Sequence, residues 1–261
     1  SACLPIGQHS AQRTSTLCVS RPKPAPLTQR PASLPRMSLT LSSLPRLLQL
    51  CSPTLPVGAY AYSQGLECAV ERGWVRDEAS VGEWILGLLD HCMQRLDLPV
   101  FARLYRSWRD ADVGAVRRWN ARLYASREAA ELQREDRHLG MALARLLVDL
   151  GVNEAASWRN APCVCFATLF SLAAARWEIP LPEAATGYAW AWTENQVAAA
   201  TRLIPLGQTA SQRLLVTAGP AVTAMVEQGL SLPDDEIGAA APGLALVSAL
   251  HETQYSRLFR S

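Results

Sequence analysis

The sequence predicts an all-α protein, a single globular domain of about ten helices behind a disordered N-terminal extension. Three observations support this prediction. Apolar residues recur at i, i+3 and i+4 along most of the chain, which is the period of an amphipathic helix. No run shows the strict apolar–polar alternation of a half-buried strand. Of the 261 residues, 49% are hydrophobic, which is enough to build a packed core.

The first 36 residues differ in composition from the rest. Ser1–Arg36 holds six of the 17 prolines, five basic residues and no acidic residue. Proline fixes φ and removes a backbone donor, so this density excludes a stable helix or a central strand. We expect a disordered extension, or residues upstream of a natural start at Met37. The helical domain is expected to span 37–261, and removal of the extension should leave its melting temperature unchanged.

Prolines, glycines and N-capping residues divide the first half of the domain into five helical segments. Leucines at helical spacing precede Pro53 and Pro56, which end the first segment. Ser63 and Asp77 are suitable N-caps for the next two, and Gly73 separates them. Asp97 is expected to restart the helix after a break. The predicted helices lie near 44–51, 63–73, 77–89, 97–108 and 112–123.

The second half contains longer helical patterns. Gly151 closes the first of them, and Pro205 ends the third. An interruption is expected at Gly219-Pro220, because proline inside a helix removes one hydrogen bond. The predicted helices lie near 128–150, 162–177, 182–203, 211–228 and 243–250.

Charge and cysteine content restrict the class of protein. Without Ser1–Arg36 the chain has 20 basic and 23 acidic residues, a net charge of −3. This balance gives no electrostatic reason to expect binding to nucleic acid or to an anionic membrane. No apolar run approaches the roughly 18 residues of a membrane span. The seven cysteines are scattered among apolar neighbours, which favours buried thiols in a reducing cytoplasm over a disulfide framework.

Residues for nucleotide or metal chemistry are sparse. The single lysine of the chain is Lys23, so a phosphate-binding P-loop, which needs a lysine after its glycine-rich turn, cannot be built. No two histidines are close in sequence. Cys163 and Cys165 are expected on a helix, where residues two apart point in divergent directions, so core packing is the favoured interpretation. The sequence therefore predicts no stably bound cofactor or metal.

Charged clusters are expected to be solvated helix surfaces. Glu131, Glu135 and Asp136 alternate with arginines at i, i+3 and i+4 spacing. Two other classes of function remain open. One is a helical metal- or cofactor-dependent enzyme that uses His91, His138 or Cys163, and the other is a nucleic-acid-binding regulator built on the Arg117–Arg127 face.

Three segments resemble the urease accessory protein UreF family. They are Leu55–Glu67 (LPVGAYAYSQGLE), Glu194–Gln208 (ENQVAAATRLIPLGQ) and His251–Ser261 (HETQYSRLFRS). Ala59 stands where the family usually has a second glycine, and it requires either a negative φ there or a small strain. The three motifs occur in the family's order, and the resemblance runs from about Leu44 to Ser261.

The resemblance implies an all-α scaffold with no active site of its own. Family members dimerise and bind a second accessory protein of the UreD/UreH type. That pair recruits the GTPase UreG and docks on apo-urease to help insert nickel. The resemblance further implies that the GTPase performs the nucleotide chemistry, that the scaffold modulates its activity, and that nickel is handled by the assembled complex.

Partner-binding residues are expected within these motifs. Glu67 and Arg202 are charges in apolar surroundings and are hypothesised to face a partner, the alternative being a local salt bridge or ordinary surface charge. The tail is predicted to form a helix that lies in a groove of the second accessory protein, the alternative being that it packs on the chain's own core. The candidate residues are Tyr60, Tyr62, Gln64, Glu67, Arg202, Gln208, Tyr255, Arg257, Leu258 and Phe259.

Overall fold

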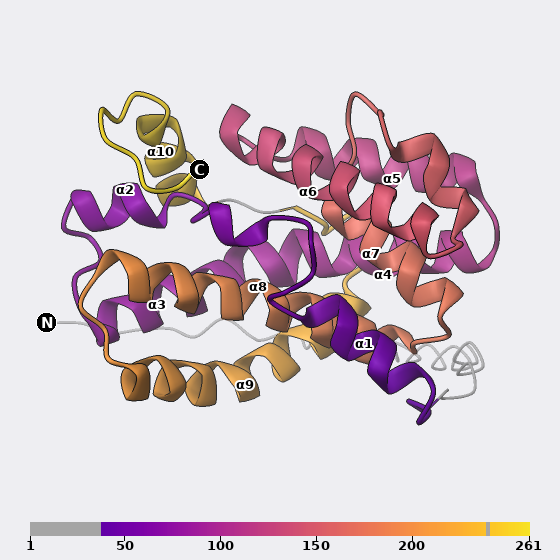
Figure 1. Ribbon diagram of the computed structural model, residues 1–261, viewed down its shortest axis with the longest axis horizontal. Helices are drawn as coiled ribbons and strands as arrows, with labels where there is room; N and C mark the ends of the chain where they lie inside the picture. Colours follow the sequence, from indigo (N-terminus) through magenta and orange to yellow (C-terminus); the bar gives the residue numbers. More distant parts are fainter. Residues whose placement is uncertain (1–37, 239–240) are drawn as a thin grey trace, which may run out of the picture. The chain divides into compact units, whose positions relative to one another are not determined.

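The computed structural model describes residues 38–238 and 241–261, and in this part of the chain it contains ten α-helices and no strand (Figure 1). The predicted all-α class and the number of helices are confirmed. The prediction of a disordered Ser1–Arg36 lies outside the described residues. None of the helices is long and apolar enough to cross a membrane, as far as the described residues go.

The helices follow each other with short connections. In the first half they are α1 (Ser43–Cys51), α2 (Leu66–Glu71), α3 (Glu78–Leu88), α4 (Leu98–Arg109) and α5 (Val113–Ala125). In the second half they are α6 (Ala130–Asp149), α7 (Phe166–Arg176), α8 (Leu181–Leu203), α9 (Gln208–Ser231) and α10 (Pro242–His251). Two 3-10 turns, η1 (Ala59–Ala61) and η3 (Asn153–Trp158), and one π-helix, η2 (Leu89–Asp97), complete the order.

The segment from α3 to α4 is continuous, and the predicted break before Asp97 is wrong. Asp77 caps its start as expected, in a capping box with Ser80. The π-helix η2 then joins α3 to α4 directly. Pro99 lies directly after η2, where it removes one backbone donor from the continuous helical segment. A π-helix has no reliable signature in sequence, and such segments are frequent at functional sites.

Helix α8 organises the core. It packs against α1, α2, α4, α7 and α9. Its Tyr188 stacks on Phe101 of α4, with ring centroids 5.2 Å apart, and meets Phe170 of α7 edge-on at 5.6 Å. Aromatic contacts of this kind add to the burial energy of the rings. The neighbouring α9 runs through Pro220 without the predicted interruption.

The start of α7 also differs from its prediction. The helix begins at Phe166, so Cys163 and Cys165 lie in the irregular segment before it. Five cysteines of the described residues are free thiols, as expected. Burial raises the pKa of Cys51 and of Cys92 to about 12, so both thiols stay protonated at neutral pH.

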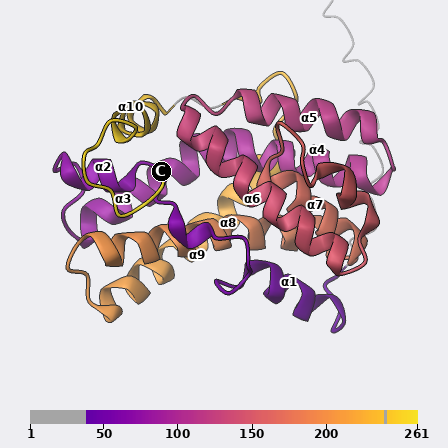
Figure 2. The same ribbon diagram turned by 45° about the horizontal axis from the view of Figure 1, so that its top comes forward.

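The two ends of the domain's sequence meet in space. Helix α10 packs against α2 and α6. The chain after α10 returns to the segment that precedes α2, and the C-terminus lies beside this segment in both views (Figures 1 and 2). The first and last of the three sequence motifs are thereby adjacent.

Candidate functional site

The Leu55–Glu67 loop is a sharply turned segment rather than an open connection. Gly58, Gln64 and Gly65 have φ of 81°, 53° and 76°, the left-handed region. A Cβ on Gly65 would lie 2.7 Å from Val247 Cγ2 of α10, so the site requires glycine for space as well as for φ. Gly65, not Ser63, is the N-cap of α2, although the Ser63 hydroxyl accepts the Glu67 N–H at 3.3 Å. Ala59 keeps a negative φ, as expected.

The C-terminal tail is bound along this loop. Its backbone pairs with the loop backbone: the Ser63 N–H donates to the Ser261 carbonyl at 2.9 Å, and the Arg260 N–H donates to the Ala61 carbonyl at 2.8 Å. The Ser63 hydroxyl also donates to the Ser261 carbonyl. These contacts join residues almost 200 positions apart in sequence.

The predicted tail helix is wrong. Helix α10 ends at His251, and the residues after it form turns and irregular backbone. Phe259 is buried at 4% exposure, whereas Leu258 is 55% exposed and Tyr255 is fully exposed, so the three side chains do not share one face. The alternative, a tail that packs on the chain's own core, is what the structure shows for Phe259.

The Glu67 side chain accepts hydrogen bonds from two backbone N–H groups of the tail, which have no helical partners. Its Oε1 accepts the Leu258 N–H at 2.6 Å, and its Oε2 accepts the Phe259 N–H at 2.9 Å. The carboxylate is buried, and backbone donors to a buried carboxylate form strong hydrogen bonds. In this chain Glu67 therefore faces the tail rather than solvent, which corrects the expectation that it points outward toward a partner.

A buried histidine links Glu67 to α6. His251 has no exposed surface; its Nε2 lies 3.1 Å from Glu67 Oε2 and its Nδ1 lies 2.7 Å from Glu131 Oε2. In its doubly protonated form the imidazole donates to both carboxylates. Arg257 of the tail donates to Glu131 Oε1 at 2.8 Å. No local sequence pattern predicts this chain of contacts, because its members lie far apart in the sequence.

Three acidic residues of α6 are buried, and their prediction as a solvated face is wrong. Glu131, Glu135 and Asp136 are 2%, 3% and 6% exposed. Glu135 accepts from Gln64 Nε2 at 2.7 Å and from Ser261 Oγ at 2.8 Å, both neutral donors. Burial raises the pKa of Glu135 to about 7, and the nearby Asp136 adds to this rise.

Arg127 forms ion pairs with two buried carboxylates, those of Asp97 and Asp136. It donates to Asp136 Oδ2 at 2.9 Å and forms a two-pronged contact with Asp97 of η2. Tyr188 donates to the same Asp97 at 3.2 Å. Burial alone would lower the pKa of Arg127, but Asp97 and Asp136 outweigh it and raise this pKa. Part of the Arg117–Arg127 face that was considered for nucleic acid is thus committed to internal ion pairs.

The other candidate residues divide between this site and the surface. Arg202 of α8 donates to the Tyr60 carbonyl at 3.0 Å and covers the Phe259 ring at 4.5 Å, a cation–π contact. The Tyr62 hydroxyl lies 2.9 Å from His138 Nδ1. Trp192 donates to Gln64 Oε1, which fixes the amide that binds Glu135. Gln208 is exposed at the start of α9, and no contact described for it joins it to the tail.

Several large side chains are exposed beside the bound tail. Tyr60 is 70% exposed and lies beside the Arg202–Phe259 pair. Leu258 and Tyr255 of the tail are also exposed, and the loop and tail that carry these side chains are fixed by buried contacts. Among the described residues, no group of three or more His, Cys, Asp or Glu side chains is placed to hold a metal ion.

Comparisons with known proteins agree with the family resemblance of the sequence. The UreF family model matches residues 75–219. The urease accessory protein UreF of Alkalilimnicola ehrlichii is 56% identical over 216 residues, which cover 83% of this chain and 95% of that protein. The chain belongs to the UreF family. Proteins of the same name from Chromohalobacter salexigens and Teredinibacter turnerae are 50% and 49% identical over 220 residues, 84% of this chain and 95% and 99% of theirs. The match to the family model begins after the Leu55–Glu67 loop and ends before the tail, whereas the matches to the relatives cover most of the chain.

Proposed function

We propose that the chain is a urease accessory protein that acts by binding other proteins. With a second accessory protein of the UreD/UreH type and the GTPase UreG, it helps insert nickel into apo-urease. It is a non-catalytic, chaperone-like scaffold that positions the GTPase and modulates its cycle. Membership of the UreF family and the names of its relatives support this role.

The observation that carries the proposal is the fixed loop-and-tail surface. Buried contacts from Glu67 and Ser63 hold the tail on the loop, while Tyr60 and Leu258 remain exposed beside it. Exposed apolar side chains on a rigid frame are typical of interface hot spots, because little conformational entropy is lost on binding. This surface is proposed as the binding site for the second accessory protein.

The test is co-purification from cells that express the urease cluster, with urease activity and nickel content as readouts. The double variant Tyr60→Ala, Leu258→Ala removes only exposed side chains and should keep the fold. We expect its affinity for the second accessory protein to fall by about tenfold or more, with loss of urease nickel. Val216→Ala removes a side chain that is 76% exposed on α9, and it serves as the matched control. Unchanged partner binding by the double variant would contradict the proposal.

A homodimer in the cytoplasm belongs to the same proposal. Sedimentation of the purified chain and fractionation of the producing cells measure both. A monomer that nevertheless activates urease would remove the dimer from the proposal and leave the scaffold role.

A further inference from the structure

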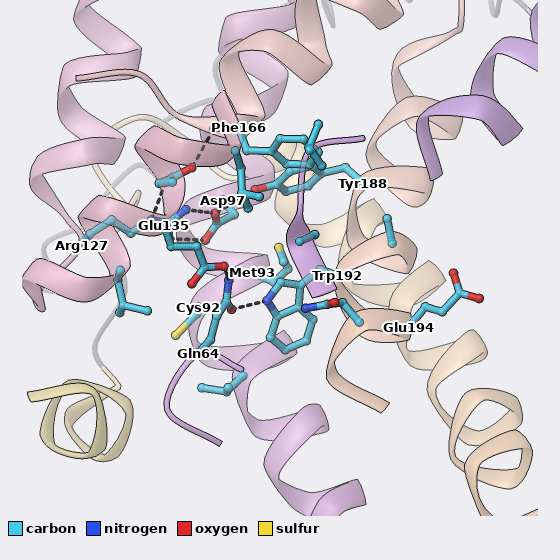
Figure 3. Close-up of a pocket in the computed structure, with 18 of the residues that line it drawn as sticks. Gln64, Cys92, Met93, Asp97, Arg127, Glu135, Phe166, Tyr188, Trp192 and Glu194 are labelled. Atoms are coloured by element: carbon cyan, nitrogen blue, oxygen red, sulfur yellow. Dashed lines mark hydrogen bonds and ion pairs between the residues drawn. The ribbon is translucent and has the colours of Figure 1, made fainter. Parts of the chain in front are cut away.

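A cavity of about 230 Å³ lies next to the bound tail, between η2, α6 and α8 and beneath the segment that runs from α1 into η1 (Figure 3). Apolar side chains form most of its wall, including Leu50, Leu96 and Leu139. Its size is suited to a small organic molecule. The UreF-family role proposed above does not use this cavity.

In the polar part of the wall, buried carboxylates outnumber the cationic groups. Asp97, Glu135 and Asp136 face a single guanidinium, that of Arg127. Asp97 and Asp136 share Arg127, so Glu135 is left with the neutral donors Gln64 and Ser261. When all three carboxylates are ionised, these buried groups have an excess of two negative charges, and the less buried Glu128 and Glu194 also line the cavity. An added cation would therefore be attracted strongly, since buried charges are poorly screened.

Aromatic rings lie on the same wall. The lining includes the rings of Trp192, Tyr188 and Phe166. The side-chain amide of Gln64 forms hydrogen bonds with both Trp192 and Glu135 (Figure 3). The ring faces of tryptophan, tyrosine and phenylalanine attract cations, and they also offer apolar surface to a carbon skeleton. Carboxylate and aromatic ring together are the features that select an organic ammonium group.

We infer that this cavity binds a small organic cation, with the ammonium group near Glu135 and the carbon skeleton against Trp192 and the apolar wall. A bare metal ion fits less well, because the described residues offer no group of three or more His, Cys, Asp or Glu side chains at metal-binding distance. Bound amine would supply the countercharge that Glu135 lacks. The raised pKa of Glu135 agrees with that lack.

The probe is benzylamine, with benzyl alcohol as its neutral isostere, titrated calorimetrically into the full chain at pH 8. We expect benzylamine to bind at least about tenfold more tightly than benzyl alcohol, since one unit of countercharge in a buried site is worth more than a factor of ten. Equal affinities for the two probes, or no saturable binding of the amine, would overturn the inference. This comparison uses the unaltered chain, so it does not depend on whether a variant folds.

Glu135→Gln keeps the shape of the side chain and removes its charge. We expect this variant to lose the preference for benzylamine, a drop of about tenfold, while benzyl alcohol binds as before. Glu71→Gln, at an exposed position of α2, is the matched control and should bind benzylamine as the unaltered chain does. A Glu135→Gln chain that is folded and retains the full amine preference would also overturn the inference.

Discussion

Glu135 shows how one buried carboxylate makes stability depend on pH. In the folded chain its pKa is about 7, because burial and Asp136 disfavour the charged form more than Gln64, Ser261 and Arg127 favour it. In the unfolded chain it titrates near its ordinary value of 4.5. Below 4.5 both states are protonated and Glu135 costs nothing. As pH rises toward 7 the unfolded state loses its proton first, so the folded state becomes relatively less stable.

Glu135→Gln should remove this dependence. Between pH 5.5 and pH 8 the chain with glutamate is expected to lose about 2 kcal/mol of unfolding free energy relative to the glutamine variant. Urea unfolding of both proteins at the two pH values gives the difference directly. A difference that is constant between the two pH values would mean that Glu135 is already ionised at pH 5.5.

Glu67 is expected to contribute more to stability than any exposed carboxylate of α2. Glu67→Ala removes the acceptor of two tail N–H groups and one of the two carboxylates that face His251. Loss of one partner from a buried charged network costs about 3–5 kcal/mol. Glu71→Ala, on the exposed side of the same helix, should cost less than about 0.5 kcal/mol.

The measurement for this pair is urea unfolding together with hydrogen exchange at Leu258 and Phe259. Both amides are hydrogen-bonded to Glu67 and should exchange faster in Glu67→Ala. Equal stability of the two variants would show that the tail does not depend on Glu67.

The sequence alone could not identify these buried carboxylates. Glu131, Glu135 and Asp136 alternate with Arg134 and Arg137 in a pattern typical of an exposed helix face. Glu131 and Glu135 contact His251 and Ser261, which lie 120 and 126 residues away, and Asp136 pairs with Arg127 from the segment before α6. A local pattern contains no information about a neighbour 120 residues away. The motifs did direct attention to Gln64, Glu67 and Arg202, though not to what these side chains contact.

At the scale of elements, the sequence predicted helices well and their junctions less well. Caps and glycines with clear physical roles, such as Asp77 and Gly151, marked real ends. Prolines predicted the ends of helices less reliably. Pro220 inside α9 costs about 3 kcal/mol in an isolated helix, but α9 packs against α3, α4, α8 and η2, and this packing offsets the loss. Tertiary contacts of this kind cannot be read from a window of local sequence.

The tail is the element whose removal should be most informative. Deletion of Tyr255–Ser261 removes the buried Phe259 ring, two donors to Glu67 and one donor to Glu135. Loss of a buried phenylalanine alone costs about 3–5 kcal/mol. We expect a clearly lower melting temperature with nearly unchanged helical circular dichroism, because α10 ends at His251, before the cut.

A control variant distinguishes the stability that comes from the tail's buried contacts from any effect of its exposed side chains. Tyr255→Ala changes a fully exposed side chain and should leave the melting temperature unchanged. If the deletion melts at the same temperature as this variant, the tail contacts seen here contribute no net stability. In that case binding to a partner would be their only remaining role.

For the whole molecule, the site is an assembly of distant segments. The Leu55–Glu67 loop, α6, α8 and the tail each contribute one side of it. Ser63 joins the loop to the tail and to α8, and Gln64 joins the loop to α6. Sequence motifs named three of these four segments. The fourth, α6, was missed because its acidic residues resemble ordinary surface. A buried network that spans the fold couples the loop, the tail and the neighbouring cavity, so a change at one is expected to affect the others.

The last prediction concerns nucleotide chemistry. The proposed role beside a GTPase requires no nucleotide site in this chain. The chain's one lysine is Lys23, and a P-loop requires a lysine directly after its glycine-rich turn to bind the β- and γ-phosphates. Isothermal titration of the isolated chain with GTP and magnesium should therefore show no saturable binding in the micromolar range. A P-loop GTPase titrated in the same buffer is the control. Micromolar affinity of the isolated chain for GTP would contradict a division of labour in which the partner performs all nucleotide chemistry. The arginine-rich face of α5, where Arg117, Arg118 and Arg122 lie, would then be the first candidate for the phosphate contacts.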